Sequence, residues 1–291
     1  MGEAALAAVP PAPTLAEGRR EAARAFREAG IATAELDARL LLCHAAGVSH
    51  EDLAANPGRA LGPKTRSRFD VVVRRRLEGE PVSRILAVRE FYGRSFGVNE
   101  AVLDPRPDTE TLIEAALGIV EQNGWRNKPI RVLDLGTGTG CILITLLAEL
   151  PFAQGVGTDA SLGALAVAQD NAQALGVADR AAFVAGNWLE PMAGAFDLIV
   201  ANPPYLTAAE MAGLSREVRH DPFHALFGGG DGLDAYRRIA ARAQLALRSG
   251  GMILLETGAG QADAVLDLLS SVGLTVAPER CVWRDLAGRP R

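Results

Sequence analysis

The chain has 291 residues, of which 48% are hydrophobic and 22% are charged, and its formal net charge is −5. These values are typical of a globular protein that is long enough to form a sizeable core and two domains. The negative charge provides no overall attraction to phosphate backbones, which argues against a nucleic acid as the main partner, and no apolar run is long enough to span a bilayer.

The three cysteines form no CxxC pair, which favours a reducing compartment and a cytoplasmic location. Residues 1–13 are rich in alanine and proline and carry Glu3, so they match a signal peptide poorly. We expect these residues to form a flexible tail ahead of the first domain.

Residues 14–82 have the pattern of a small helical domain. Apolar residues recur at helical spacing, glycine closes the first two periodic segments, and Pro63 opens the last one. The expected helices cover residues 15–30, 34–47, a short segment after Ser49, and 63–80. Short helices joined by short turns indicate a helical bundle.

The stretch 59–76 is strongly basic, with Asp70 as its only acidic residue. The basic residues are Arg59, Lys64, Arg66, Arg68, Arg74, Arg75 and Arg76. Such a stretch can contact an acidic protein surface or RNA, but a solvated helix face is the simpler interpretation.

A linker is expected next, at residues 83–104, where two β-rich runs flank Gly93 and predict a β-hairpin. The chain then enters Pro105-Arg106-Pro107, which is stiff because proline fixes φ. Asp108 or Thr109 can cap the helix that follows.

From residue 130 onward, strand patterns alternate with helix patterns, which predicts a mostly parallel sheet with helices on both faces. We expect strands at 130–136, 155–160, 181–188, 196–205 and 250–257, with closing strands at 274–278 and 281–286. The expected helices are 141–150, 161–176, 233–247 and 261–273. We therefore treat residues 105–291 as one α/β domain.

A glycine-rich loop, DLGTGTG at 134–140, follows the first strand of this sheet and opens a helix. Glycines in such a loop let the backbone pass close to a ligand. Cys141 occupies the position of the third glycine in a dinucleotide-binding GxGxxG motif, and no Gly-Lys-Ser/Thr sequence follows. These features argue against a dinucleotide-dependent oxidoreductase and against a phosphate-binding loop of the Walker type.

Two further groups stand at strand ends. Asp159 ends the second strand, where a carboxylate can accept the hydroxyls of a ribose, although it could instead cap the next helix. Asn187 and Trp188 follow the third strand, where an amide and an indole can contact an adenine ring. A turn asparagine beside a core tryptophan is an equally good interpretation of that pair.

The fourth strand ends in Asn202-Pro203-Pro204-Tyr205. Prolines often stop strands, so the tetrapeptide by itself indicates only a turn. Other polar residues are weaker candidates. Glu256 ends the fifth strand, where it can either face the site or contribute to packing. His220 and His224 have HxxxH spacing, but the acid of a zinc-binding motif is missing, which favours a structural role for both histidines.

The combination of DLGTGTG, the acid of the second strand and NPPY resembles the class I S-adenosylmethionine-dependent methyltransferases. Within them, the chain is most similar to the HemK/PrmC family of release factor glutamine methyltransferases. The further stretches that carry this resemblance are EPVSRILAVREFYG, VLDPRPDTE, GGGDGLDAYRRI, GGMILLETG and DLAGRPR. The resemblance as a whole spans roughly residue 34 to the end of the chain.

The resemblance implies a seven-stranded Rossmann-like methyltransferase domain, preceded by a helical substrate-recognition domain and the hairpin linker. It implies methyl transfer from S-adenosyl-L-methionine to the glutamine amide in the Gly-Gly-Gln motif of class I peptide release factors, with no metal. The implied cofactor residues are Asp134, Gly136, Thr137, Gly138, Thr139, Gly140, Asp159, Asn187, Trp188 and Asn202. The implied substrate residues are Asn202, Pro203, Pro204 and Tyr205, of which Asn202, Pro203 and Tyr205 are the catalytic candidates.

Two residues depart from the family pattern. Asp104 stands where the family often has Ile, and Asn187 stands where it often has Asp. Two related activities also remain open, because NPPY occurs in nucleic-acid adenine N6-methyltransferases and the family has a cousin that methylates a ribosomal protein on glutamine. Acidic residues outnumber basic ones in 83–291, which disfavours a nucleic-acid substrate, and the RPDTE sequence at 106–110 favours release factors.

Overall fold

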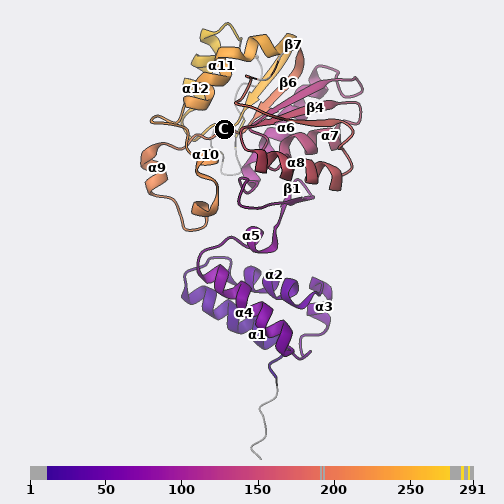
Figure 1. The fold of residues 1–291 in the computed structure, drawn as a ribbon, viewed down its shortest axis with the longest axis vertical. Helices are drawn as coiled ribbons and strands as arrows, with labels where there is room; N and C mark the ends of the chain where they lie inside the picture. The colour runs from indigo at the N-terminus through magenta and orange to yellow at the C-terminus, as the bar shows by residue number, and fades with distance from the viewer. Residues whose placement is uncertain (1–11, 191, 193, 276–282, 285–287, 289–291) are drawn as a thin grey trace, which may run out of the picture. The chain divides into compact units, whose positions relative to one another are not determined.

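The computed structural model describes residues 12–190, 192, 194–275, 283–284 and 288. The chain divides into two compact units, Met1–Leu86 and Ala87–Arg291. Figure 1 shows the first unit as helices and the second as a sheet surrounded by helices.

The first unit contains five helices in its described part. They are α1 (Leu15–Glu28), α2 (Ala34–Ala46), α3 (His50–Ala55), α4 (Pro63–Leu77) and α5 (Val82–Leu86). Thr14 and Glu17 form a capping box at the start of α1, and Gly47 adopts the left-handed conformation that ends α2. The apolar faces of these helices bury one shared core, to which Phe26, Leu41, Leu42, Leu61 and Phe69 contribute.

Two boundaries of this unit differ from the sequence-based expectation. The carbonyl of Pro13 accepts a hydrogen bond from the Leu61 amide at 2.7 Å, so the chain is already part of the fold before residue 14. Residues 1–11 of the expected tail lie outside the described residues. The linker was expected from residue 83, but α5 continues to Leu86 because this short segment packs against α2 and α4.

The basic stretch 59–76 is less available as a charged surface than its sequence suggests. Arg76 is buried, and its Nε lies 2.7 Å from the Asp37 carboxylate, which is buried as well. Arg66 also pairs with Glu21 and Asp70, and Arg75 pairs with Glu80. Its exposed basic side chains are Arg59, Lys64, Arg68 and Arg74.

The second unit begins with the expected hairpin, in which β1 (Val88–Phe91) pairs antiparallel with β2 (Arg94–Gly97). Tyr92 and Gly93 make the turn, and both have positive φ, of 51° and 69°. The chain continues through the single-turn helix η1 (Pro107–Thr109) into α6 (Glu110–Gln122).

A parallel sheet forms the centre of the second unit, with strand order β5-β4-β3-β6-β7. Its strands are β3 (Arg131–Leu135), β4 (Gln154–Asp159), β5 (Ala181–Ala185), β6 (Phe196–Ala201) and β7 (Leu247–Leu255). The described part of the sheet thus has five strands, and the closing strands expected at 274–278 and 281–286 fall mostly outside the described residues.

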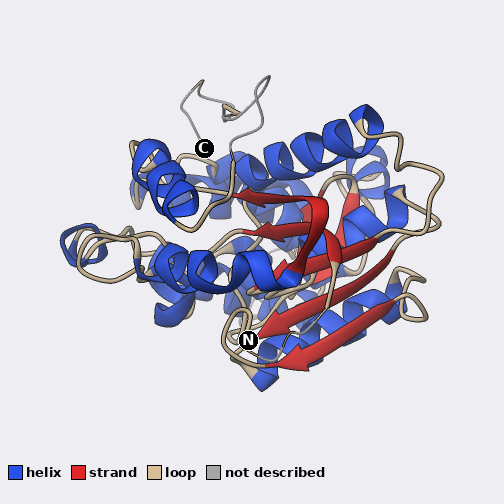
Figure 2. Ribbon diagram, turned by 90° about the horizontal axis from the view of Figure 1, so that it is seen from above, coloured by secondary structure: helices blue, strands red, loops and turns tan. Residues whose placement is uncertain are grey.

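Helices cover both faces of this sheet, as Figure 2 shows. The longer helices of the unit are α6, α7 (Cys141–Glu149), α8 (Leu162–Ala174), α11 (Asp234–Ala246) and α12 (Ala262–Ser271). The short segments α9 (Ala208–Ala212), η2 (Val218–His220) and α10 (Phe223–Leu226) lie between β6 and α11 in the sequence. None of the helices within the described ranges is long and apolar enough to cross a membrane.

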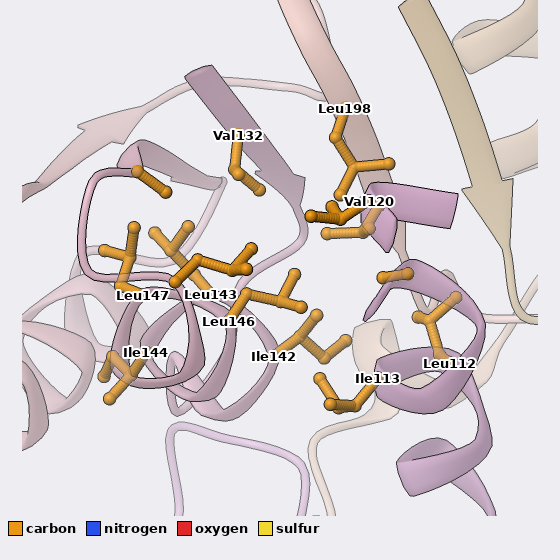
Figure 3. Packing of buried hydrophobic residues seen from close by; sticks show 14 of the residues in the cluster. Leu112, Ile113, Val120, Val132, Ile142, Leu143, Ile144, Leu146, Leu147 and Leu198 are labelled. Atoms are coloured by element: carbon orange, nitrogen blue, oxygen red, sulfur yellow. The ribbon is translucent and has the colours of Figure 1, made fainter. Parts of the chain in front are cut away.

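The alternation of strand side chains decides which helix packs on which face. Val132 and Leu198 point toward α6 and α7, where Figure 3 shows them above Ile142 and Val120. The other face holds Leu133, Ile199 and residues of α11 in a separate cluster. These two clusters hold the central strands β3 and β6 rigidly, so the loops that follow them are anchored on a firm scaffold.

The strand order reverses at β3, and this creates a site at one edge of the sheet. The chain passes from β3 to β4 and β5 on one side and then returns to β6 on the other side. Leu135 is paired both with Thr158 and with Ala201, so the residues that follow these three positions emerge together. Ligands of open α/β sheets bind at such a switch point, outside the carboxyl ends of the strands.

Candidate functional site

The glycine loop between β3 and α7 has the conformation that its sequence requires. Gly136, Gly138 and Gly140 have φ values of 69°, 54° and 78°, which side chains rarely adopt. A Cβ on Gly140 would also lie 2.7 Å from Ile144 Cδ1 and 3.2 Å from Ala168 Cβ, so it would crowd both side chains. The loop therefore presents bare backbone at the carboxyl edge of the sheet.

Asp134 lies buried beneath this loop. Its Oδ2 accepts a hydrogen bond from Thr137 Oγ1 at 2.6 Å, whereas its Oδ1 has no hydrogen-bond partner among the described residues. Burial raises the pKa of Asp134 to about 7, against the smaller lowering effect of the Thr137 hydrogen bond.

Asp159 ends β4, and its carboxylate binds the backbone of the glycine loop. Its Oδ2 accepts from the Gly138 amide at 3.0 Å and its Oδ1 accepts from the Ser161 amide at 2.9 Å. Ser161 itself caps α8 through the Ala164 amide. Asp159 is therefore not the cap of that helix, and a carboxylate with about four acceptor positions keeps capacity for a ligand.

Trp188 packs against the core and also lies on the wall of a cavity at the carboxyl ends of the strands. Its indole packs against the core cluster of Leu133 and lies close to Gly136, where an added Cβ would be 3.3 Å from the ring. Its φ is 50°, which is uncommon for a residue with a side chain, and its carbonyl accepts from Thr158 Oγ1 at 3.2 Å. This constrained backbone holds the indole and the neighbouring exposed Asn187 at the carboxyl ends of the strands.

The NPPY segment is held by hydrogen bonds to residues from distant parts of the sequence. Asn202 Nδ2 donates to Thr109 Oγ1 at 3.0 Å, and Gln261 Nε2 donates to the Tyr205 carbonyl at 3.1 Å. Gln261 Oε1 also accepts from the Gly258 amide at 3.0 Å. Both ends of the tetrapeptide are thus held by residues that are distant in sequence.

A glycine-rich segment at 228–232 packs against the same tetrapeptide. A Cβ on Gly228 would lie 2.8 Å from Tyr205 Cα, and one on Gly232, whose φ is 76°, would collide with the Tyr205 carbonyl. Gly228 and Gly232 are therefore needed for close backbone approach to Tyr205. The Gly228 amide also donates to the carbonyl of Leu206, the residue that follows the tetrapeptide, at 2.9 Å.

A cavity of about 390 Å³ unites many of these residues. Of the residues that the sequence singled out, its wall includes Gly136, Gly138, Asp159, Asn187, Trp188, Asn202 and Pro204. Asp134, Thr137, Thr139, Gly140, Pro203 and Tyr205 are not part of that wall. Thr139 instead supports it, because its carbonyl accepts from Asn171 Nδ2 at 2.9 Å.

The segment 104–110 contributes more to the site than sequence reasoning anticipated. The expectation that Asp108 or Thr109 caps α6 was wrong for Thr109, whose side chain makes no capping hydrogen bond and contacts Asn202 instead. Glu110 Oε1 accepts from the Tyr92 amide at 2.9 Å and so ties the hairpin to α6. The RPDTE sequence was a visible signal, but its partners lie far away along the chain.

Asp221 joins this segment to the opposite wall of the cavity. Its buried carboxylate pairs with Arg106 and accepts from the Asp104 amide at 3.2 Å. Residues 101–103 and 224–225, on either side of these contacts, line the cavity. The Asp104 contact uses its backbone amide, so it does not explain why an aspartate stands at this position.

His224 and Arg238 also line the cavity, which the sequence did not predict for either residue. Both are exposed, and the described residues contain no cluster of three or more His, Cys, Asp or Glu side chains that could hold a metal ion. Glu256 is buried at the end of β7, where its carbonyl accepts from the Tyr236 hydroxyl at 2.8 Å.

Comparison with known proteins agrees with the architecture. The catalytic domain of hMettl16, solved in complex with MAT2A 3′UTR hairpin 6, is similar with a TM-score of 0.50 and 19% identity, over 66% of this chain and 70% of that chain. This likeness shows the α/β methyltransferase fold. The PrmC N-terminal domain matches residues 17–86, and the methyltransferase small domain matches residues 119–221.

Curated relatives match nearly the whole chain. A release factor glutamine methyltransferase of Bradyrhizobium diazoefficiens is 47% identical over 96% of this chain and 93% of its own length. One of Cereibacter sphaeroides is 47% identical over 95% of this chain and 96% of its own length. The chain therefore belongs to the family of release factor glutamine methyltransferases.

Proposed function

We propose that the chain transfers a methyl group from S-adenosyl-L-methionine to the N5 side-chain amide of the glutamine in the Gly-Gly-Gln motif of class I peptide release factors. The observation that carries this proposal is the joint placement of Asn202, after β6, and the glycine loop, after β3, on one cavity. The family to which the chain belongs supports the same activity.

The residues of the cavity suit the adenosine part of the cofactor. The bare backbone of Gly136 and Gly138 permits close approach, Asp159 has free acceptor capacity for ribose hydroxyls, and the Trp188 indole can cover a planar base. Asn187 replaces an acid common in the family, and its side-chain oxygen can still accept from an adenine amine. A volume of about 390 Å³ is within the range of small-molecule sites.

When bound, S-adenosyl-L-methionine supplies a methyl group that its sulfonium has already activated. The protein therefore has to place the amide nitrogen and favour the geometry in which its lone pair is free. The side-chain oxygen of Asn202 and the backbone carbonyl of Pro203 are suited to accept the two N–H bonds of that amide. Orientation of this kind is worth roughly 7–11 kcal/mol at best.

Pro203, Pro204 and Tyr205 make this acceptor pair rigid. Proline fixes φ, so the carbonyl direction costs little entropy when substrate binds. Gln261 and Gly232 confine the Tyr205 backbone, and the Tyr205 ring can lie against the flat amide and exclude water. We assign no metal and no covalent intermediate to the reaction.

The domain roles belong to the proposal as well. The first unit, which ends at Leu86, is assigned to recognition of the release factor, residues 87–104 to a linker and residues 105–291 to methyl transfer. The last two strands of a seven-stranded sheet are assigned to 274–278 and 281–286. The reaction is placed in the cytoplasm, where release factors act. Because much of the basic stretch 59–76 is paired internally, its exposed part Arg59, Lys64, Arg68 and Arg74 is the surface to test for partner binding.

The decisive experiment supplies the purified chain with methyl-labelled S-adenosyl-L-methionine and, in separate reactions, with an intact release factor, ribosomal proteins and nucleic acid. Mass spectrometry then locates the label. We expect it on the Gly-Gly-Gln glutamine. Label on adenine or on a ribosomal-protein glutamine, with none on the release factor, would refute the proposal in favour of one of the two related activities.

A further inference from the structure

Thr109 stands at the start of α6, where threonine commonly caps a helix with its hydroxyl. Its backbone is helical, with φ −68° and ψ −17°, and its side chain makes no capping hydrogen bond. The side chain is nevertheless buried, and its Oγ1 receives the hydrogen bond from Asn202 Nδ2 at 3.0 Å. The hydroxyl is thus committed to a residue 93 positions away in sequence rather than to its own helix.

This contact fixes the position of the Asn202 amide, and in this structure Nδ2 faces Thr109. The nitrogen and oxygen of an amide lie on different sides of Cγ, so an Nδ2 atom held at Thr109 turns Oδ1 away from it. No donor among the described residues reaches Oδ1, and Asn202 belongs to the cavity wall. The oxygen is therefore left as an acceptor for a bound molecule.

An asparagine amide is not oriented by its own torsion, because χ2 is broad and roughly two-fold. Turned over, Asn202 would present an N–H to the N–H of a substrate amide, and two donors repel each other. We propose that Thr109 is a positioning residue, which holds Asn202 with its oxygen toward the methyl-accepting nitrogen. This inference rests on the proposed function, because it assumes that the accepting nitrogen lies against Asn202.

The kinetic test compares Thr109→Val, which keeps the shape and removes the hydroxyl, with Thr109→Ser, which keeps the hydroxyl. The matched control is Thr145→Val, because Thr145 is fully buried in α7 and its hydroxyl has no hydrogen-bond partner among the described residues. For Thr109→Val we expect kcat on the release factor to fall about five- to tenfold, the effect of one hydrogen bond. The KM for release factor and the Kd for cofactor should stay within about twofold, while Thr109→Ser and Thr145→Val should retain the kcat of the wild type.

A second measurement needs no substrate. In ¹⁵N-labelled protein, the side-chain amide signals of Asn202, assigned by their loss in Asn202→Asp, report directly on the hydrogen bond at Nδ2. We expect these signals to shift and their protons to exchange faster in Thr109→Val but not in Thr109→Ser or Thr145→Val.

The outcomes separate this inference from the proposed function. An unchanged kcat or unchanged Asn202 amide signals in Thr109→Val would overturn the positioning role, as would an equal loss of kcat in Thr109→Ser. A wild-type chain that leaves the release factor unmethylated would instead refute the proposed function, and the amide signals would still decide whether Thr109 orients Asn202.

Discussion

Asn202 is the residue on which the proposed chemistry depends most directly. It is half-buried, it follows the fully buried strand β6, and one end of its amide is already engaged by Thr109. Because this side chain is already ordered, binding of the accepting nitrogen costs it little conformational entropy. Its role can therefore be tested apart from cofactor binding.

We predict that Asn202→Ala lowers kcat by at least about a hundredfold, because it removes an acceptor that pre-orients the nucleophile. Cofactor affinity should fall by less than about tenfold, since the glycine loop and Asp159 remain. Methyl-transfer kinetics and calorimetric titration of cofactor measure the two effects. An enzyme that retained transfer would exclude the acceptor role.

Asp134 predicts a pH dependence of stability. Its pKa of about 7 lies above the ordinary value of 3.8. Between these two pH values, Asp134 is protonated in the folded protein and ionised in the unfolded chain. The stability that this proton provides is fully present below about pH 4 and is lost as pH rises toward 7, by up to about 1.4 kcal/mol per pH unit.

Urea unfolding of the cofactor-free protein should show this effect. Relative to Asp134→Asn, which does not ionise but whose amide oxygen can still accept from Thr137, the wild type should lose stability between pH 4 and pH 7. Groups elsewhere cancel in the difference between the two proteins. Parallel stability curves across this range would show that Asp134 does not take up a proton in the fold.

At the scale of elements, the site is built by loops that are packed backbone against backbone. The glycine loop follows β3, NPPY follows β6, and the GGGDG segment closes on Tyr205. Strand pairing sets the first two side by side, while small residues allow the third to approach. This close approach depends on individual glycines of the segment 228–232.

We predict opposite results for two alanine substitutions that lie two residues apart. Gly232→Ala should destabilise the protein by about 1–3 kcal/mol and reduce activity, because φ is 76° and the new Cβ would collide with the Tyr205 carbonyl. Gly230→Ala should be neutral, since no atom lies within 4 Å of its Cβ position. Thermal unfolding and methyl-transfer assays of both variants test this, and similar behaviour of the two would contradict the packing argument.

At the scale of the whole molecule, the two units have different sources of order. The second unit is organised around a parallel sheet with a hydrophobic core on each face. The first unit has one hydrophobic core between its helices and contains the buried Asp37–Arg76 ion pair. Removing one partner of such a pair leaves an uncompensated buried charge. The same basic stretch therefore contains residues that support the fold and residues that face solvent.

We predict that Arg76→Ala lowers the unfolding free energy of the first unit by about 3–5 kcal/mol. Arg74→Ala, two residues earlier on the exposed side of α4, should change it by less than about 0.5 kcal/mol. Denaturation of the full chain, followed by far-ultraviolet circular dichroism, compares them. Equal stabilities would mean that the Asp37–Arg76 pair contributes nothing net.

Local patterns in the sequence predicted much of this molecule. Helical spacing, closing glycines and strand–helix alternation predicted most of the described elements, because each depends on residues close in sequence. The glycine loop and NPPY could be placed at the same sheet edge, since parallel strands carry their carboxyl ends to one side. The part played by Thr109 was missed because a threonine ahead of a helix has the same local pattern whether it caps or not.

By itself, the sequence determined the family, the α/β architecture and the two motifs of the proposed site, all of which depend on residue type and spacing. Only the tertiary structure decided which distant side chains meet: Thr109 with Asn202, Gln261 with Tyr205, and Arg76 with Asp37. The physical reason is that these contacts join residues 93, 56 and 39 positions apart. Their geometry comes from strand order and helix packing, which no local pattern contains.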